Sequence, residues 1–247
     1  MPYKIKVNSK RQLKEPDEYV STVEGIVSYV KDNLRVLGIL ISISLVAAIA
    51  YGAFIIKERT DDAKAVKLEY DASRYYFGSG PEKKGQDLKK AIDIYQKISA
   101  DYKRSSSAPI ALYYMGNAHL DLKEYDAAIN AYKGFTERYP DKKDLVSLVY
   151  QRLGYAYLAK GDDKDAVESF NKAAGLELAK NRDQSLYESG RILEKMGQKD
   201  DALKKYKEIV TSFPSSPYSS EAQVKIKGLG GDQTPKDTKK DDKKVNK

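Results

Sequence analysis

The 247-residue sequence contains no cysteine, no tryptophan and a single histidine. Without thiols the chain cannot form a disulfide, a zinc–thiolate site, an iron–sulfur cluster or a cysteine nucleophile. A lone histidine also argues against a multi-histidine metal site and a histidine-based catalytic triad. We therefore expect a protein that is not an enzyme, with no catalytic residues, no cofactor and no metal.

Neither sign of charge dominates the sequence, although charged residues are abundant. Lysine and arginine number 44 against 36 acidic residues, which gives a formal net charge of +8. A nucleic-acid-binding surface needs clustered basic residues rather than mixed charge. We expect no nucleic-acid partner.

Charge is missing altogether from residues 36–56. A helix of that length spans roughly 30 Å, the thickness of the hydrocarbon core of a bilayer. We predict one transmembrane helix over residues 35–57, in the inner (cytoplasmic) membrane. The competing interpretation is a cleaved signal peptide. We favour an uncleaved anchor, because the apolar run continues past the small residues at 48–50 and the preceding polar segment is long.

Within this segment Ser44, Ala48 and Gly52 recur every four residues. Small residues at that spacing let another membrane helix approach closely, so they are candidate transmembrane packing residues. The orientation stays open. Basic residues just after the span favour a cytoplasmic C-terminal domain, but this rule is weak for long domains.

The segments outside the apolar run differ in character. Residues 1–14 are polar and predicted to be disordered, and residues 15–34 predict a short amphipathic helix with valines at spacings of three and four. Residues 230–247 carry mixed charge with one aliphatic side chain, so they cannot bury a core and are predicted to be disordered.

Three stretches between residues 112 and 214 repeat one pattern. In each, an alanine follows a glycine by twelve residues and an aromatic residue follows it by sixteen. The glycines are Gly116, Gly154 and Gly190, the alanines Ala128, Ala166 and Ala202, and the aromatic residues Tyr132, Phe170 and Tyr206. We interpret glycine and alanine as the small residues where two antiparallel helices cross. Since alanine is the better helix former, Gly154→Ala is expected to be harmless or mildly stabilising.

This pattern resembles the tetratricopeptide repeat family, whose motif is W-x2-L-G-x2-Y…A-x3-F…P. The sequence departs from the motif in having no tryptophan, Ser189 in place of a leucine and Leu178 in place of the middle proline. The resemblance implies an all-α fold: one N-terminal transmembrane helix, then a solenoid of about four helical hairpins over residues 58–229 with a C-terminal capping helix.

The order of short segment, single span and repeat domain resembles the YfgM-like ancillary subunit of the Sec translocon. The closing phrase FPSSPYSSEAQVKIKGL is also similar to the ends of bacterial envelope repeat proteins such as CpoB. These resemblances imply a periplasmic scaffold that binds other proteins, either in a membrane complex or as exported or unfolded polypeptides. The alternative is a structural subunit of another membrane complex, held by its transmembrane helix. An enzyme or a nucleic-acid binder is least favoured.

The first helix of each hairpin lines the concave face in tetratricopeptide domains, so the resemblance also implies a candidate peptide-binding groove. Tyrosines with a few amides and one arginine suit peptide binding. The alternative is that these tyrosines only pack between hairpins. The candidate residues are Tyr76, Tyr113, Asn117, Gln151, Tyr155, Tyr187 and Arg191.

Overall fold

The computed structural model describes residues 16–78, 80–177 and 179–231. The chain divides into two compact units, Met1–Arg59 and Thr60–Lys247. The polar segment 1–14 and all but the first two residues of the predicted tail 230–247 lie outside the described residues, so these two predictions are not tested.

The first unit holds helix α1 (Pro16–Asp32) and the beginning of helix α2 (Leu34–Phe77). In the part of the chain that the structure describes, α2 is the one helix long and apolar enough to cross a membrane. Its large apolar side chains are exposed, for example Ile41 and Val46. An apolar run of this length without protein around it matches the thickness of a bilayer.

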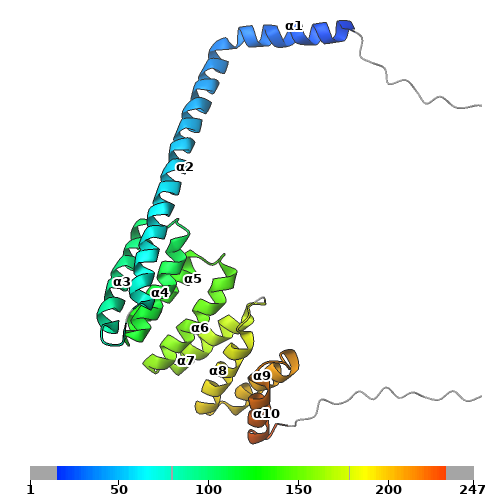
Figure 1. The fold of residues 1–247 in the computed structure, drawn as a ribbon. Coiled ribbons are helices and arrows are strands. Elements are labelled where there is room, and N and C mark those ends of the chain that lie inside the picture. Colours follow the sequence, from blue (N-terminus) through cyan, green and yellow to red (C-terminus); the bar gives the residue numbers. More distant parts are fainter. Residues whose placement is uncertain (1–15, 79, 178, 232–247) are drawn as a thin grey trace, which may run out of the picture. The chain divides into compact units, whose positions relative to one another are not determined.

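The second unit is a stack of four helical hairpins with one further helix. The C-terminal part of α2 pairs with α3 (Lys84–Asp101) through a shared buried cluster. The next hairpins are α4 (Ser107–Asp121) with α5 (Tyr125–Arg138), α6 (Lys143–Lys160) with α7 (Asp163–Gly175), and α8 (Arg182–Lys195) with α9 (Lys199–Ser212), and α10 (Ser219–Gly228) follows (Figure 1). No strand occurs among the described residues. The all-α solenoid predicted from the repeats is confirmed.

The turns inside three hairpins share one backbone conformation. Lys123, Gly161 and Gly197 have φ angles of 61°, 94° and 76°, in the left-handed region that favours glycine. At the α6–α7 turn the amide of Asp162 donates to the carbonyl of Tyr157 over 2.9 Å, which satisfies the end of α6. A left-handed residue at the same place in each hairpin explains the regular, short connections.

The glycine of each repeat lies under an aromatic ring. A Cβ built on Gly116 would lie 2.5 Å from Cε1 of Tyr132, and one on Gly154 would lie 2.9 Å from three atoms of the Phe170 ring. The same arrangement holds at Gly190. The aromatic residue sixteen positions after the glycine, rather than the alanine twelve positions after it, therefore occupies the space above the glycine. The expectation that Gly154→Ala is harmless is wrong, because the new Cβ would overlap the fully buried ring of Phe170.

Polar side chains link successive hairpins at a separation of about one repeat. The hydroxyl of Tyr139 donates to the Lys103 carbonyl over 2.7 Å. Ser147 donates to the side chain of Asn181, and Tyr187 donates to the carboxylate of Glu221. The first two bonds join neighbouring hairpins and the third joins the last hairpin to α10, and each of these junctions uses a different pair of residues.

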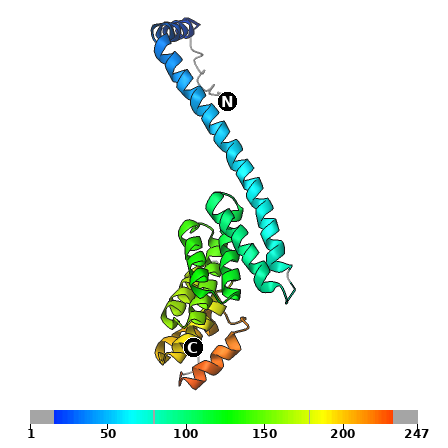
Figure 2. The ribbon, with the colours of Figure 1, turned by 90° about the vertical axis from the view of Figure 1, so that its left-hand side faces the viewer.

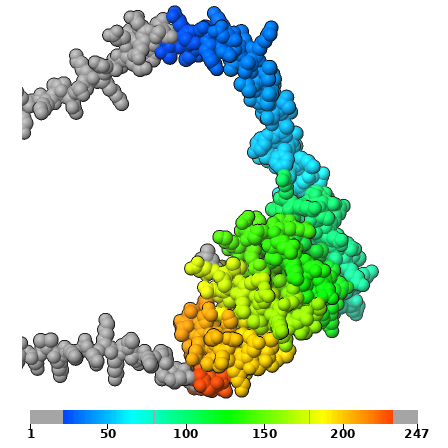
Figure 3. All heavy atoms as spheres, turned by 180° about the vertical axis from the view of Figure 1, so that it is seen from behind, coloured from blue at the N-terminus to red at the C-terminus, as the bar shows by residue number. Residues whose placement is uncertain are grey.

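Helix α10 covers the C-terminal end of the stack. Ala222 and Ile226 are buried against α8 and α9, while Val224 on the opposite side of α10 is exposed. Figure 2 shows α10 lying across this end, and in Figure 3 the atoms from α8 to α10 (yellow to red) form one continuous surface. The predicted capping helix is therefore present, and it closes the apolar face that the last hairpin would otherwise expose.

Candidate protein-binding face

The first helices of the hairpins carry the predicted groove residues. We call the surface formed by the C-terminal part of α2 with α4, α6 and α8 the first-helix face. Tyr76, Tyr113 and Tyr155 are partly exposed on these helices, and the Arg191 side chain is 49% exposed. Four of the seven predicted residues are thus within reach of a partner.

The other three predicted residues are buried and hold the solenoid together. Asn117 accepts a hydrogen bond from the Tyr132 hydroxyl over 2.6 Å. Gln151 is buried beside Ser185 of the next hairpin, and Tyr187 is 7% exposed and stacks on Tyr218. These contacts match the packing alternative for the three residues, and a role for any of the seven in peptide binding stays a prediction.

A neutralised polar cluster occupies the C-terminal half of the first-helix face. The Tyr155 hydroxyl accepts from the Gln184 amide over 3.1 Å and donates to Glu188 over 3.3 Å. Nε and Nη2 of Arg191 donate to the other oxygen of Glu188 over 3.0 Å and 2.7 Å. Burial, followed by the charge of Glu188, raises the pKa of Tyr155 to about 12. The arginine here already has its counter-charge.

A second cluster, in the N-terminal half of the face, surrounds a residue that the sequence analysis missed. Arg152 of α6 is partly exposed, and its guanidinium lies close to the Tyr113 side chain. Burial lowers the pKa of Arg152, but the neighbouring phenols of Tyr113, Tyr132 and Tyr76 outweigh it, and the net shift is upward. Burial raises the pKa of Tyr76 to about 12.

Position in the repeat explains why Arg152 was overlooked. Gln151 precedes its glycine by the same number of residues as Tyr113 does, so the repeat places both at one groove position. The next residue of a helix points about 100° away, so Arg152 reaches α4 while Gln151 turns to α8. The sequence contains one signal for Arg152. It is an arginine next to a predicted groove position, with no acidic residue three or four positions away on the same helix.

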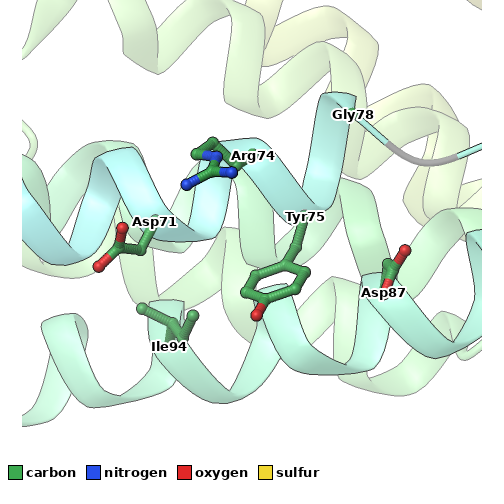
Figure 4. A pocket seen from close by; sticks show the side chains of 6 residues that line it. All are labelled: Asp71, Arg74, Tyr75, Gly78, Asp87 and Ile94. Carbon is green, nitrogen blue, oxygen red and sulfur yellow. The ribbon is translucent and has the colours of Figure 1, made fainter.

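A shallow pocket lies between α2 and α3, away from this cluster. Its volume is about 690 Å³, and Figure 4 shows the Tyr75 ring between the two helices with Arg74 nearby. The ammonium of Lys90 lies 5.2 Å from the centre of the Tyr75 ring and also pairs with Asp87 over 3.2 Å. The pocket holds no nucleophile next to a base, so we assign it no chemistry.

The described residues contain no group of three or more histidine, cysteine, aspartate or glutamate side chains placed to hold a metal ion. The small residues Ser44, Ala48 and Gly52 lie on α2, and nothing stands within 4 Å of a Cβ built on Gly52. That side of α2 has room for a second helix. Packing there stays a prediction.

Comparisons with known proteins agree on the fold. The family model for YfiO, described as an outer membrane lipoprotein, matches residues 69–231. No curated protein sequence matches the chain. The match begins after the apolar segment 36–56, so it covers the hairpins and α10 but not the candidate membrane span.

Solved structures with similar folds are distant in sequence. The apo form of RapI aligns with a TM-score of 0.54 and 14% identity over 70% of this chain, and the chain spans 50% of RapI. A kinesin light chain with tetratricopeptide-like repeats from Podosopora anserina aligns with a TM-score of 0.51 and 14% identity. The alignment covers 68% of this chain and 86% of that one. MamA aligns with a TM-score of 0.46 and 21% identity over 60% of this chain and 83% of MamA. At these identities the first two show the fold alone.

Proposed function

Because the chain belongs to the YfiO family of outer membrane lipoproteins and has a tetratricopeptide fold, we propose that it is a non-enzymatic scaffold that binds other proteins in the cell envelope. The observation that carries this proposal is the row of partly exposed tyrosines, Tyr76, Tyr113 and Tyr155, on three successive first helices. Binding through such a surface requires no chemistry from the chain.

Tyrosines in this setting are effective contact residues. Each presents a rigid ring for apolar contact and a hydroxyl for hydrogen bonds, with few rotatable bonds to order. Tyr155 is already fixed by Glu188 and Gln184, and its ring packs edge-on against Phe170 at 5.0 Å between centroids. A partner would therefore meet a preorganised surface, which lowers the entropy lost on binding.

We further propose that residues 36–56 anchor the scaffold in the inner membrane with the solenoid on the periplasmic side. The family description indicates the envelope, but the sequence has no cysteine to carry a thioether- or thioester-linked lipid, and the apolar segment of α2 supplies an alternative anchor. An anchored scaffold of this kind suits an ancillary or chaperone-adaptor subunit of a translocon or assembly machine.

A second candidate is a structural subunit held through the face of α2 that carries Ser44, Ala48 and Gly52. The open space at Gly52 favours it. Pull-down from detergent with and without residues 1–56 separates the two roles. A partner bound by the first-helix face is retained without this segment, whereas a partner bound by the span is lost.

The test of the scaffold proposal is crosslinking in membranes followed by mass spectrometry. The double variant Tyr113→Ala/Tyr155→Ala removes two aromatic contacts, and losing two such anchors weakens binding roughly tenfold to a hundredfold. Lys172→Ala/Lys204→Ala is the matched control, since both lysines lie on second helices and are exposed. Circular dichroism checks that both variants remain helical. If the tyrosine variant keeps every crosslinked partner at wild-type yield, the face is not the binding site.

A further inference from the structure

Arg152 brings a permanent positive charge into the first-helix face without a carboxylate partner. An arginine guanidinium stays protonated in proteins. The Nε atom of Arg152 is buried and has no hydrogen-bond acceptor, and no acid of the described residues forms an ion pair with this side chain. A partly buried arginine without a counter-charge is unusual, because buried charges are normally paired.

The side chains that lie close to Arg152 are polar but carry no charge at neutral pH. They are the phenols of Tyr76, Tyr113 and Tyr132, from three different helices. The acid near this cluster, Asp121, pairs with Lys84 over 3.4 Å. The Tyr113 hydroxyl, close to the guanidinium, has a hydrogen that it can donate to a further acceptor. Cation and phenol together form a site for an anionic oxygen.

A second arginine on this face, Arg191, has the counter-charge that Arg152 lacks. Arg191 binds one oxygen of Glu188 through two nitrogens. Both arginines project from first helices, yet the chain provides an acid for Arg191 and none for Arg152. The missing acid at Arg152 is the group that we expect a partner to bring.

We propose that the first-helix face binds an acidic segment of a partner protein, with a glutamate or aspartate side chain on Arg152 and Tyr113. This inference rests on the scaffold function and names its partner class. The site lies between Tyr76 on α2 and Tyr155 on α6, so a bound chain continues in both directions; this favours an internal side chain over a chain end.

The test uses the full chain, immobilised in detergent, and three acetylated peptide pools with random uncharged flanks. One pool has glutamate at its central position and an amidated end, the second has glutamine there, and the third has glutamine with a free terminal carboxylate. Mass spectrometry measures the retention of each pool. We expect the glutamate pool to be retained roughly tenfold better than the glutamine pool, and less so as salt is raised.

Variants assign the preference to the proposed residues. Arg152→Gln should bring the retention ratio to about one, and Tyr113→Phe should reduce it while leaving the fold intact. Arg152→Lys, which keeps the charge, should retain part of the preference and covers the case in which Arg152→Gln fails to fold. Lys204→Gln removes one positive charge from α9, where the lysine is paired with Asp201, and should leave the ratio unchanged.

Three results would overturn the inference: equal retention of the glutamate and glutamine pools, a preference that survives Arg152→Gln, or a preference for the pool with the free terminal carboxylate. None of these touches the scaffold function, which is decided by the crosslinking yields of Tyr113→Ala/Tyr155→Ala. If Tyr113→Ala/Tyr155→Ala loses crosslinks but the chain shows no preference for the glutamate pool, the scaffold proposal is supported and the acidic-partner proposal is rejected.

Discussion

Two glycine-to-alanine changes should move stability in opposite directions although both replace a glycine inside a helix. Alanine is the better helix former by about 1 kcal/mol at either place. On Gly154 of α6 the new Cβ would meet three Phe170 ring atoms at 2.9 Å, whereas on Gly134 of α5 the nearest atom, a Leu112 methyl, is 3.9 Å away. Only the first position is overpacked.

The magnitudes follow from these distances. Gly134→Ala should raise the free energy of unfolding by about 0.5–1 kcal/mol, because the new contact is an ordinary one and alanine favours the helix more than glycine does. Gly154→Ala has the same gain but an overpacking cost of about 1–3 kcal/mol, so we expect a net loss of about 1 kcal/mol. For a unit of this size each kcal/mol moves the melting temperature by about 2–4 °C.

Thermal melts of a fragment of residues 60–231, followed by circular dichroism, measure both changes. The melting temperature should rise for Gly134→Ala and fall for Gly154→Ala. Adding Phe170→Leu to Gly154→Ala should cost less than the two single changes together, since the smaller side chain relieves the overlap. Equal stabilisation by both alanines would refute the close approach of Phe170 to α6.

Two further predictions concern pH and topology. Burial raises the pKa of Tyr76 and Tyr155 to about 12, against about 10 in an unfolded chain. The folded state holds these protons more tightly, so this part of the stability is complete below about pH 10 and is lost as pH rises through about 12. Urea unfolding at increasing pH checks this, and a flat profile would contradict it. We also expect protease to degrade the solenoid once the outer membrane is permeabilised; survival until the inner membrane is lysed would place it in the cytoplasm.

The hairpins could be predicted because small residues recur in the sequence at the spacing of the repeat. A glycine followed at fixed spacings by an alanine and an aromatic residue places all three on facing sides of two helices. The pattern does not say which large side chain reaches the glycine. That choice depends on the rotation of one helix against the other, and it reversed the expected effect of alanine at Gly154.

The candidate face was predictable only in part. Tyr155 and Tyr187 are both first-helix tyrosines in the sequence, but the hydroxyl of Tyr187 meets Glu221 of α10, one repeat further on, and its ring is buried there. Arg152 gained its importance from tyrosines on three other helices. Such neighbours come from packing between hairpins, which no local pattern encodes.

The polar links between hairpins have a consequence for how this solenoid can change over time. Tyr139 with Lys103, Ser147 with Asn181 and Tyr187 with Glu221 are unlike pairs, so each of these junctions fits only its own two neighbours, the last pair being the final hairpin and α10. Duplicating or exchanging a hairpin would bury donors opposite the wrong neighbours, at a cost for each unpaired group. The repeats are therefore not interchangeable modules: the order of the hairpins is specified at their junctions, and the chain should evolve by substitution more readily than by gain or loss of repeats.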